Sequence, residues 1–195
     1  MDTYSGEVLE AQVFENVKFN QQDLSGAEFG RCEFKGCDFT EADLGAARFD
    51  SCSFDSCNLS NPKIDKARLV DCEFSACKLA GINFYKCSQS VFDLRFSDCR
   101  LIDCNFTDIK MKGSAFLRCD FRECYFQNSF LVEVDFSGSS FRGTLFSSAN
   151  LEKASFRGAH GYSIDPRSNK VKKAIFSVPD VLSLLDAFEI VIKEE

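Results

Sequence analysis

The chain of 195 residues contains no tryptophan, three prolines, two methionines and a single histidine. His160 has no candidate nucleophile nearby, so the sequence gives little basis for nucleophilic or acid–base catalysis. No run of 18 apolar residues is present, which argues against a membrane-spanning helix. Positive charge is also scarce: 23 Lys and Arg stand against 30 Asp and Glu, for a net charge of −7. That balance disfavours direct binding of nucleic acid, which needs cations against the phosphates.

The first residues, MDTYSGEVLEAQ, are acidic and polar and are unlike a secretory signal. We therefore expect a cytoplasmic protein whose thiols are reduced.

Phenylalanine and cysteine are abundant, with 22 and 11 residues, and both follow a five-residue frame. In residues 32–79 a large apolar residue, the centre, stands at every fifth position, and a small residue stands two places before it. The frame runs over residues 9–84 and again over residues 96–156, and 18 of the 22 Phe are centres. These centres predict a core of stacked Phe and Leu side chains.

A spacing of five residues fits neither a straight strand nor an α-helix. On a helix successive centres would lie roughly 140° apart, and on a strand they would alternate between faces. The chain keeps every centre inside only if it turns a corner after each frame. Because Cys32, Cys52 and Cys72 recur every 20 residues, we predict four frames per turn and a square coil.

The frame resembles the signature of the pentapeptide-repeat family. The motifs that carry the resemblance are CDFTE (37–41), ADLGA (42–46), VDFSG (134–138) and ANLEK (149–153), and it covers residues 7–158. It implies an all-β fold, a right-handed quadrilateral parallel β-helix.

Within the family, the layout resembles the Qnr-type quinolone-resistance proteins and the microcin-immunity protein McbG. The shared features are a rod of Phe and Leu centres, a projecting loop, and the tail GYSIDPRSNKVKKAIF followed by a short apolar helix. The resemblance implies a homodimer formed through the tail, with the dimensions and charge of duplex DNA. It also implies binding of DNA gyrase or topoisomerase IV.

The frame breaks once, where 12 residues separate the consecutive centres Phe84 and Phe96. Either two residues are added after a missing repeat, or seven are inserted within one. We favour seven, because the later cysteines then stay in the ladders of the earlier ones. This choice predicts a projecting loop at residues 87–93 with Val91 and Phe92 exposed.

On that alignment one outer face is the most negative of the four and is the predicted partner-binding face. The predicted partner-binding residues are Glu33, Asp55, Glu73, Asp103, Asp120 and Glu123 on this face and Ser88, Gln89, Ser90, Val91 and Phe92 in the loop. The face centred on Leu24, Leu44 and Ile64 has a small net positive charge, with Lys63, Lys66, Lys86, Lys110, Lys112 and Lys153.

We divide the chain into a solenoid, residues 1–158, and a tail, residues 159–195, with a turn, a strand and a short helix. Pro179 suits the first position of that helix. The residues predicted to join two copies, cap the coil or do both are Val181, Leu182, Leu185 and Phe188.

The cysteines stand at the small inward position, and we interpret them as compact hydrophobic side chains. We expect no metal, no cofactor and no enzymatic activity. The leading hypothesis is a DNA-mimicking binder of a type II topoisomerase that modulates it or protects it from quinolones or other poisons. The alternative is a scaffolding solenoid whose protein partner is unrelated to DNA topology.

Overall fold

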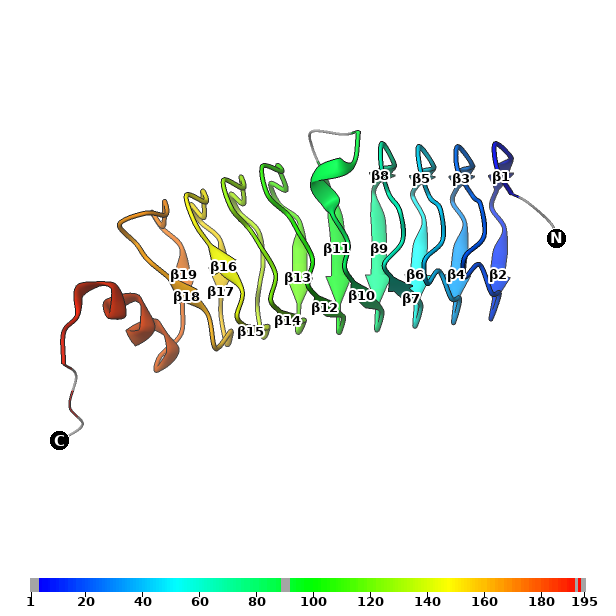
Figure 1. The fold of residues 1–195 in the computed structure, drawn as a ribbon. Helices are drawn as coiled ribbons and strands as arrows, with labels where there is room; N and C mark the ends of the chain where they lie inside the picture. Colours follow the sequence, from blue (N-terminus) through cyan, green and yellow to red (C-terminus); the bar gives the residue numbers. More distant parts are fainter. Residues whose placement is uncertain (1–3, 89–91, 192, 194–195) are drawn as a thin grey trace.

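The structure, a computed structural model, describes residues 4–88, 92–191 and 193 and is a parallel β-solenoid of about eight turns (Figure 1). It confirms the predicted quadrilateral parallel β-helix with a short C-terminal helix. Neighbouring strands in each sheet come from successive turns, so the sheets run along the rod and the strands run across it.

Three sheets form most of the walls. The four-stranded sheet holds β1 (Val8–Glu10), β3 (Glu28–Gly30), β5 (Arg48–Asp50) and β8 (Arg68–Val70). The six-stranded sheet holds β2 (Val13–Glu15), β4 (Glu33–Lys35), β6 (Ser53–Asp55), β9 (Cys72–Ser75), β11 (Leu94–Ser97) and β13 (Ala115–Leu117). The five-stranded sheet holds β7 (Asn58–Ser60), β10 (Lys78–Ala80), β12 (Arg100–Ile102), β14 (Asp120–Arg122) and β15 (Ser140–Arg142).

Shorter elements complete the coil. The paired strands are β16 (Leu145–Phe146) with β18 (Ser163–Ile164) and β17 (Ser155–Phe156) with β19 (Ile175–Phe176). The 3₁₀ helices are η1 (Phe84–Lys86) and η2 (Asp180–Phe188).

Most corners of the coil are made by one residue in the left-handed backbone conformation. Along one corner, Gln21, Glu41, Asn61 and Gly81 have φ of 57°, 55°, 53° and 64°. This conformation costs a non-glycine residue about 1–2 kcal/mol. The corner amides offset part of that cost by bonding to the next turn, as Gln21 N does by donating to Thr40 O at 2.9 Å.

The core contains an unbroken column of stacked rings that begins on the six-stranded sheet and continues beyond it along the same wall. Its members are Phe14, Phe34, Phe54, Phe74, Phe96, Phe116, Phe136, Phe156 and Phe176. Successive ring centroids lie 4.7–5.3 Å apart. Because Phe176 stacks on Phe156 at 5.1 Å, the coil continues beyond residue 158.

The register across the break differs from the one predicted. Phe96 of β11 pairs with Phe74 of β9, and Leu101 of β12 pairs with Leu79 of β10, so the turn holds 22 residues. The break therefore adds two residues, and the prediction of a seven-residue insertion was wrong.

The wrong alignment across the break came from the assumption that the cysteine ladders continue on the same faces. The Cys99 thiol donates to Phe74 O at 3.4 Å, as the Cys77 thiol does to Phe54 O, so Cys99 continues the ladder of Cys77 and not that of Cys72. The position above Cys72 is taken by Leu94. Leucine and cysteine thus substitute for each other at the small position, and cysteine does not mark a particular face.

Phe92 is a core residue, not an exposed one. It is 1% exposed, and its amide N donates to Lys110 O at 2.8 Å, the bond that a centre makes to the next turn. The prediction that Phe92 contacts a partner from an exposed loop was therefore wrong. Ser88 is exposed and its amide still bonds to Ala67 O at 3.0 Å, whereas Gln89, Ser90 and Val91 lie outside the described residues.

Candidate binding faces

The thiols face inward and serve packing. The Cys32 and Cys52 thiols donate to carbonyl oxygens of the preceding turn at 3.4 and 3.2 Å. Burial raises the pKa of Cys52 to about 11 and the pKa of the half-buried Cys87 to about 12. Within residues 4–88, 92–191 and 193, no three His, Cys, Asp or Glu side chains are grouped to hold a metal ion. No helix in this part of the chain is long and apolar enough to cross a membrane.

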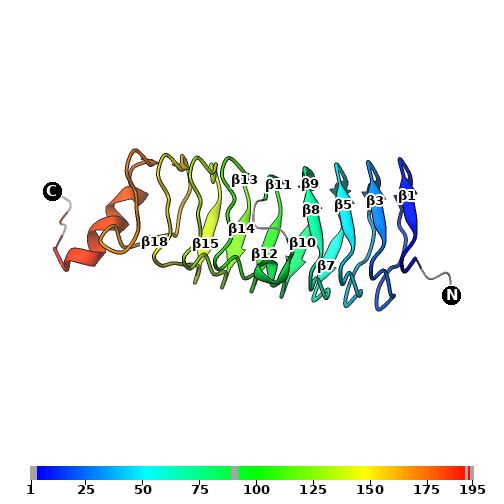
Figure 2. The ribbon, with the colours of Figure 1, turned by 90° about the horizontal axis from the view of Figure 1, so that it is seen from above.

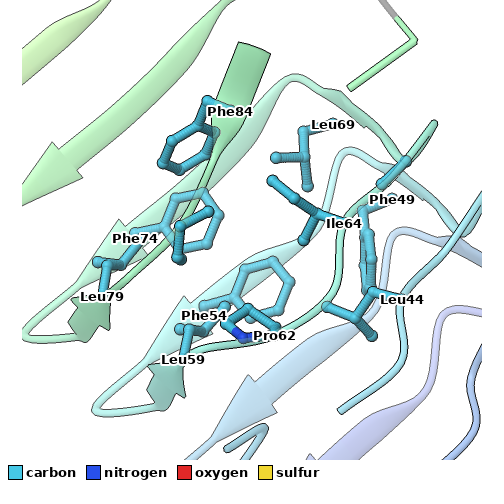
Figure 3. A pocket seen from close by; sticks show the side chains of 12 residues that line it. Leu44, Phe49, Phe54, Leu59, Pro62, Ile64, Leu69, Phe74, Leu79 and Phe84 are labelled. Atoms are coloured by element: carbon cyan, nitrogen blue, oxygen red, sulfur yellow. The ribbon is translucent and has the colours of Figure 1, made fainter. Parts of the chain in front are cut away.

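The interior has a packing defect in the turn whose centres are mostly aliphatic. Leu59, Ile64 and Leu69 follow one another there, and an apolar cavity of about 20 Å³ lies among them and the Phe54 and Phe74 rings (Figure 3). A cavity of this size has room for no more than about one water molecule, far less than an organic substrate needs.

The predicted acidic residues do not share one face. Glu33, Asp55 and Glu73 lie on the six-stranded sheet. Asp120 lies on β14 of the five-stranded sheet, and Asp103 and Glu123 take the corner positions that follow β12 and β14. The predicted register was one frame off after the break, so the two groups lie on different walls and the prediction of a single acidic face was wrong.

Ion pairs neutralise part of each group. Glu33 lies 2.7 Å from Lys35 on the same strand. Asp120 lies 2.8 Å from Arg122 and 3.7 Å from Arg100 of the preceding turn. Burial is the largest single influence on the pKa of Asp120 and acts to raise it, but hydrogen bonds to Arg122 and Ser140 and the nearby arginine charges together keep this pKa below its ordinary value.

Many charges pair from one turn to the next. The Arg118 guanidinium donates two hydrogen bonds, of 2.8 and 2.7 Å, to the carboxylate of Asp98. Asp98 lies 20 residues earlier in the chain, in the preceding turn. Hydrogen bonding to Arg118 lowers the pKa of Asp98, and the same bonds raise the pKa of the guanidinium. Lys63 and Asp43 form a longer pair of the same kind, at 3.6 Å. Many of the exposed charged side chains therefore form ion pairs that link one turn to the next.

The tail helix η2 lies at the C-terminal end of the rod, next to the last turn (Figure 2). Of the predicted joining residues, Leu182 and Phe188 are 42% and 51% exposed, and Val181 and Leu185 are half-buried. Ser183 Oγ donates to Tyr162 O at 3.3 Å, which ties the helix to the coil. Its apolar side chains are thus only partly covered by this chain.

Sequence reasoning missed a cluster of lysines on the later turns of the wall that begins as the four-stranded sheet. The segment NKVKK at residues 169–173 holds the signal, but the wrong register placed Lys110 and Lys112 with Lys63. In the structure Lys110 and Lys170 share a column, and that column lies on a different wall from Lys63.

Comparison with known families agrees with the coil. Three family profiles match in succession: "Pentapeptide repeats (9 copies)" over residues 14–58, "Pentapeptide repeat region" over residues 47–123 and "Pentapeptide repeats (8 copies)" over residues 119–158. The chain belongs to the pentapeptide-repeat family. A search of curated proteins finds no match for this pentapeptide-repeat protein.

Several solved pentapeptide-repeat structures resemble the chain. Full-length QnrB1, a plasmid-mediated fluoroquinolone-resistance protein, is 16% identical with a TM-score of 0.46, over 94% of this chain and 100% of its own. A trypsin-treated variant of QnrB1 is 23% identical with a TM-score of 0.43, over 100% and 96%. HetL, involved in heterocyst differentiation regulation in the cyanobacterium Nostoc, is 16% identical with a TM-score of 0.37, over 89% and 87%. These likenesses concern the fold.

Proposed function

We propose that this pentapeptide-repeat protein is a non-enzymatic binding module that offers the outer faces of its coil to a protein partner. One observation carries the proposal: most large apolar side chains and nearly all thiols are inside, and the outer rows are mainly short or charged side chains on a regular lattice. Solenoids of this kind present extended surfaces and bind by shape and charge.

The partner we propose is a type II topoisomerase, DNA gyrase or topoisomerase IV, which the protein would modulate or protect from quinolones or other poisons. The net charge of −7, the rod shape and the resemblance of the repeats and tail to Qnr-type sequences support this choice. Asp103 and Glu123 are the strongest acidic candidates, since they share a corner in consecutive turns and both are exposed. A homodimer joined through η2 would lengthen the rod.

A gyrase supercoiling assay with a fluoroquinolone tests this choice. We expect the wild-type protein to alter inhibition by the drug, and Asp103→Asn with Glu123→Gln to weaken that effect. A matched control, Asp50→Asn with Asp71→Asn, removes the same charge from the side of the four-stranded sheet and should act like the wild type. If no ratio of protein to gyrase changes supercoiling or drug sensitivity, the topoisomerase is not the partner.

The pairing of charges between turns favours a second candidate, a scaffold whose partner has no role in DNA topology. A DNA mimic needs uncompensated negative charge, whereas Glu33, Asp98 and Asp120 are all paired here. A pull-down from the native host separates the two candidates. Recovery of topoisomerase subunits supports the first, and recovery of another protein without them supports the second.

A further inference from the structure

The wall that begins as the four-stranded sheet carries a dense group of exposed lysines in its later turns. Lys110, Phe130, Asn150 and Lys170 are bridged in register, turn upon turn. We define the basic face by its exposed lysines, which are Lys110, Lys112, Lys153, Lys170, Lys172 and Lys173. It spans four turns, roughly 14 Å along the rod at about 4.8 Å per turn.

Most of this positive charge has no carboxylate partner. Glu133 pairs with Lys153 at 2.6 Å and with Lys112 at 3.7 Å. In the part of the chain that the structure describes, no salt bridge reaches Lys110, Lys170, Lys172 or Lys173. Many charges elsewhere are paired between turns, so this face holds uncompensated positive charge on a protein of net charge −7.

An apolar spot lies inside the basic face. The Phe130 side chain is 38% exposed and stands between Lys110 and Asn150 in the column, with half-buried Val132 beside it. An exposed ring surrounded by cations suits a partner that has both negative charge and an apolar side chain.

We propose that the basic face binds an acidic segment of a protein, with an apolar residue of that segment placed on Phe130. The site is separate from the acidic candidates Asp103 and Glu123, and it does not depend on a topoisomerase as partner. A protein segment fits better than nucleic acid, because a duplex longer than the basic face would run along a molecule of net negative charge and be repelled.

The test is fluorescence anisotropy with the full chain and a labelled peptide of Glu and Gly residues that contains a central Leu-Phe pair. We expect binding that weakens as salt is raised. Lys170→Glu with Lys172→Glu should weaken it by about tenfold or more, since each substitution turns an attraction into a repulsion. Phe130→Ser should weaken binding without changing the salt dependence.

Lys18→Glu with Lys78→Glu makes the same change in net charge away from the basic face and serves as the matched control. Circular dichroism checks that all variants keep the β-solenoid. The proposal is overturned if the peptide does not bind at low salt, if both double variants weaken binding equally, or if labelled duplex DNA binds more tightly than the peptide.

Discussion

The register across the break can be tested by a double-mutant cycle between Phe74 and Phe96. Their rings stack at 4.8 Å with an interplanar angle of 9°, and each ring is at most 2% exposed. We choose Phe→Leu at both positions because leucine already serves as a centre at Leu59 and Leu79. The substitution keeps most of the buried volume and removes the ring contacts.

The magnitude follows from counting ring contacts. Phe74 also stacks on Phe54, and Phe96 on Phe116, so each single substitution removes two stacked contacts. At about 0.5–1.5 kcal/mol per aromatic pair, each single variant loses about 1–3 kcal/mol. The double variant removes three contacts instead of four. Its loss should therefore fall short of the sum by about 0.5–1.5 kcal/mol.

Urea unfolding followed by circular dichroism measures the four free energies of unfolding. The control cycle pairs Phe96→Leu with Leu69→Ala, because the seven-residue insertion would have stacked Phe96 on Leu69. We expect this pair to be additive within about 0.5 kcal/mol, since the two residues lie on different sheets. Coupling in the control cycle and additivity between Phe74 and Phe96 would refute the register.

Three further predictions concern the cavity, the tail and one ion pair. Leu59→Phe should fill part of the cavity and extend the Phe19–Phe39 stack, which raises the free energy of unfolding in urea by about 0.5–1.5 kcal/mol. As a control, Leu131→Phe places the same ring in a fully packed part of the core and should be destabilising. Leu185→Asp should give monomers in sedimentation with an unchanged β spectrum, and persistence of dimers would place the interface elsewhere. Arg118→Gln should raise the pKa of Asp98 in an NMR titration. Because the folded-state pKa of Asp98 is depressed, the ion pair contributes its full stability above the ordinary value of 3.8, and this contribution is lost as the pH falls through the folded-state pKa. The free energy of unfolding of the variant should therefore fall less on acidification than that of the wild type.

The coil could be predicted because its signal is repeated in every frame. A spacing of five residues has only one way to keep each centre inside, and the buried rings from Phe14 to Phe156 follow it. The break could not be aligned in this way, since only one copy of it exists. Phe92 shows the limit: it lies three residues late for its frame, and its burial and its bond to Lys110 O in the structure identify it as a centre.

The binding faces depend on that single alignment more than the core does. A shift of one frame leaves every centre buried, because each face of the coil receives an apolar residue. The same shift moves each outward side chain of the later turns to a different wall, so Asp120 and Glu123 leave the side of Glu33, and Lys110 leaves the side of Lys63. The core is therefore compatible with either register, whereas the positions of the outer charges differ between the two registers. Any partner that binds these outer faces contacts an arrangement of charges set by the two residues added between Phe84 and Phe96.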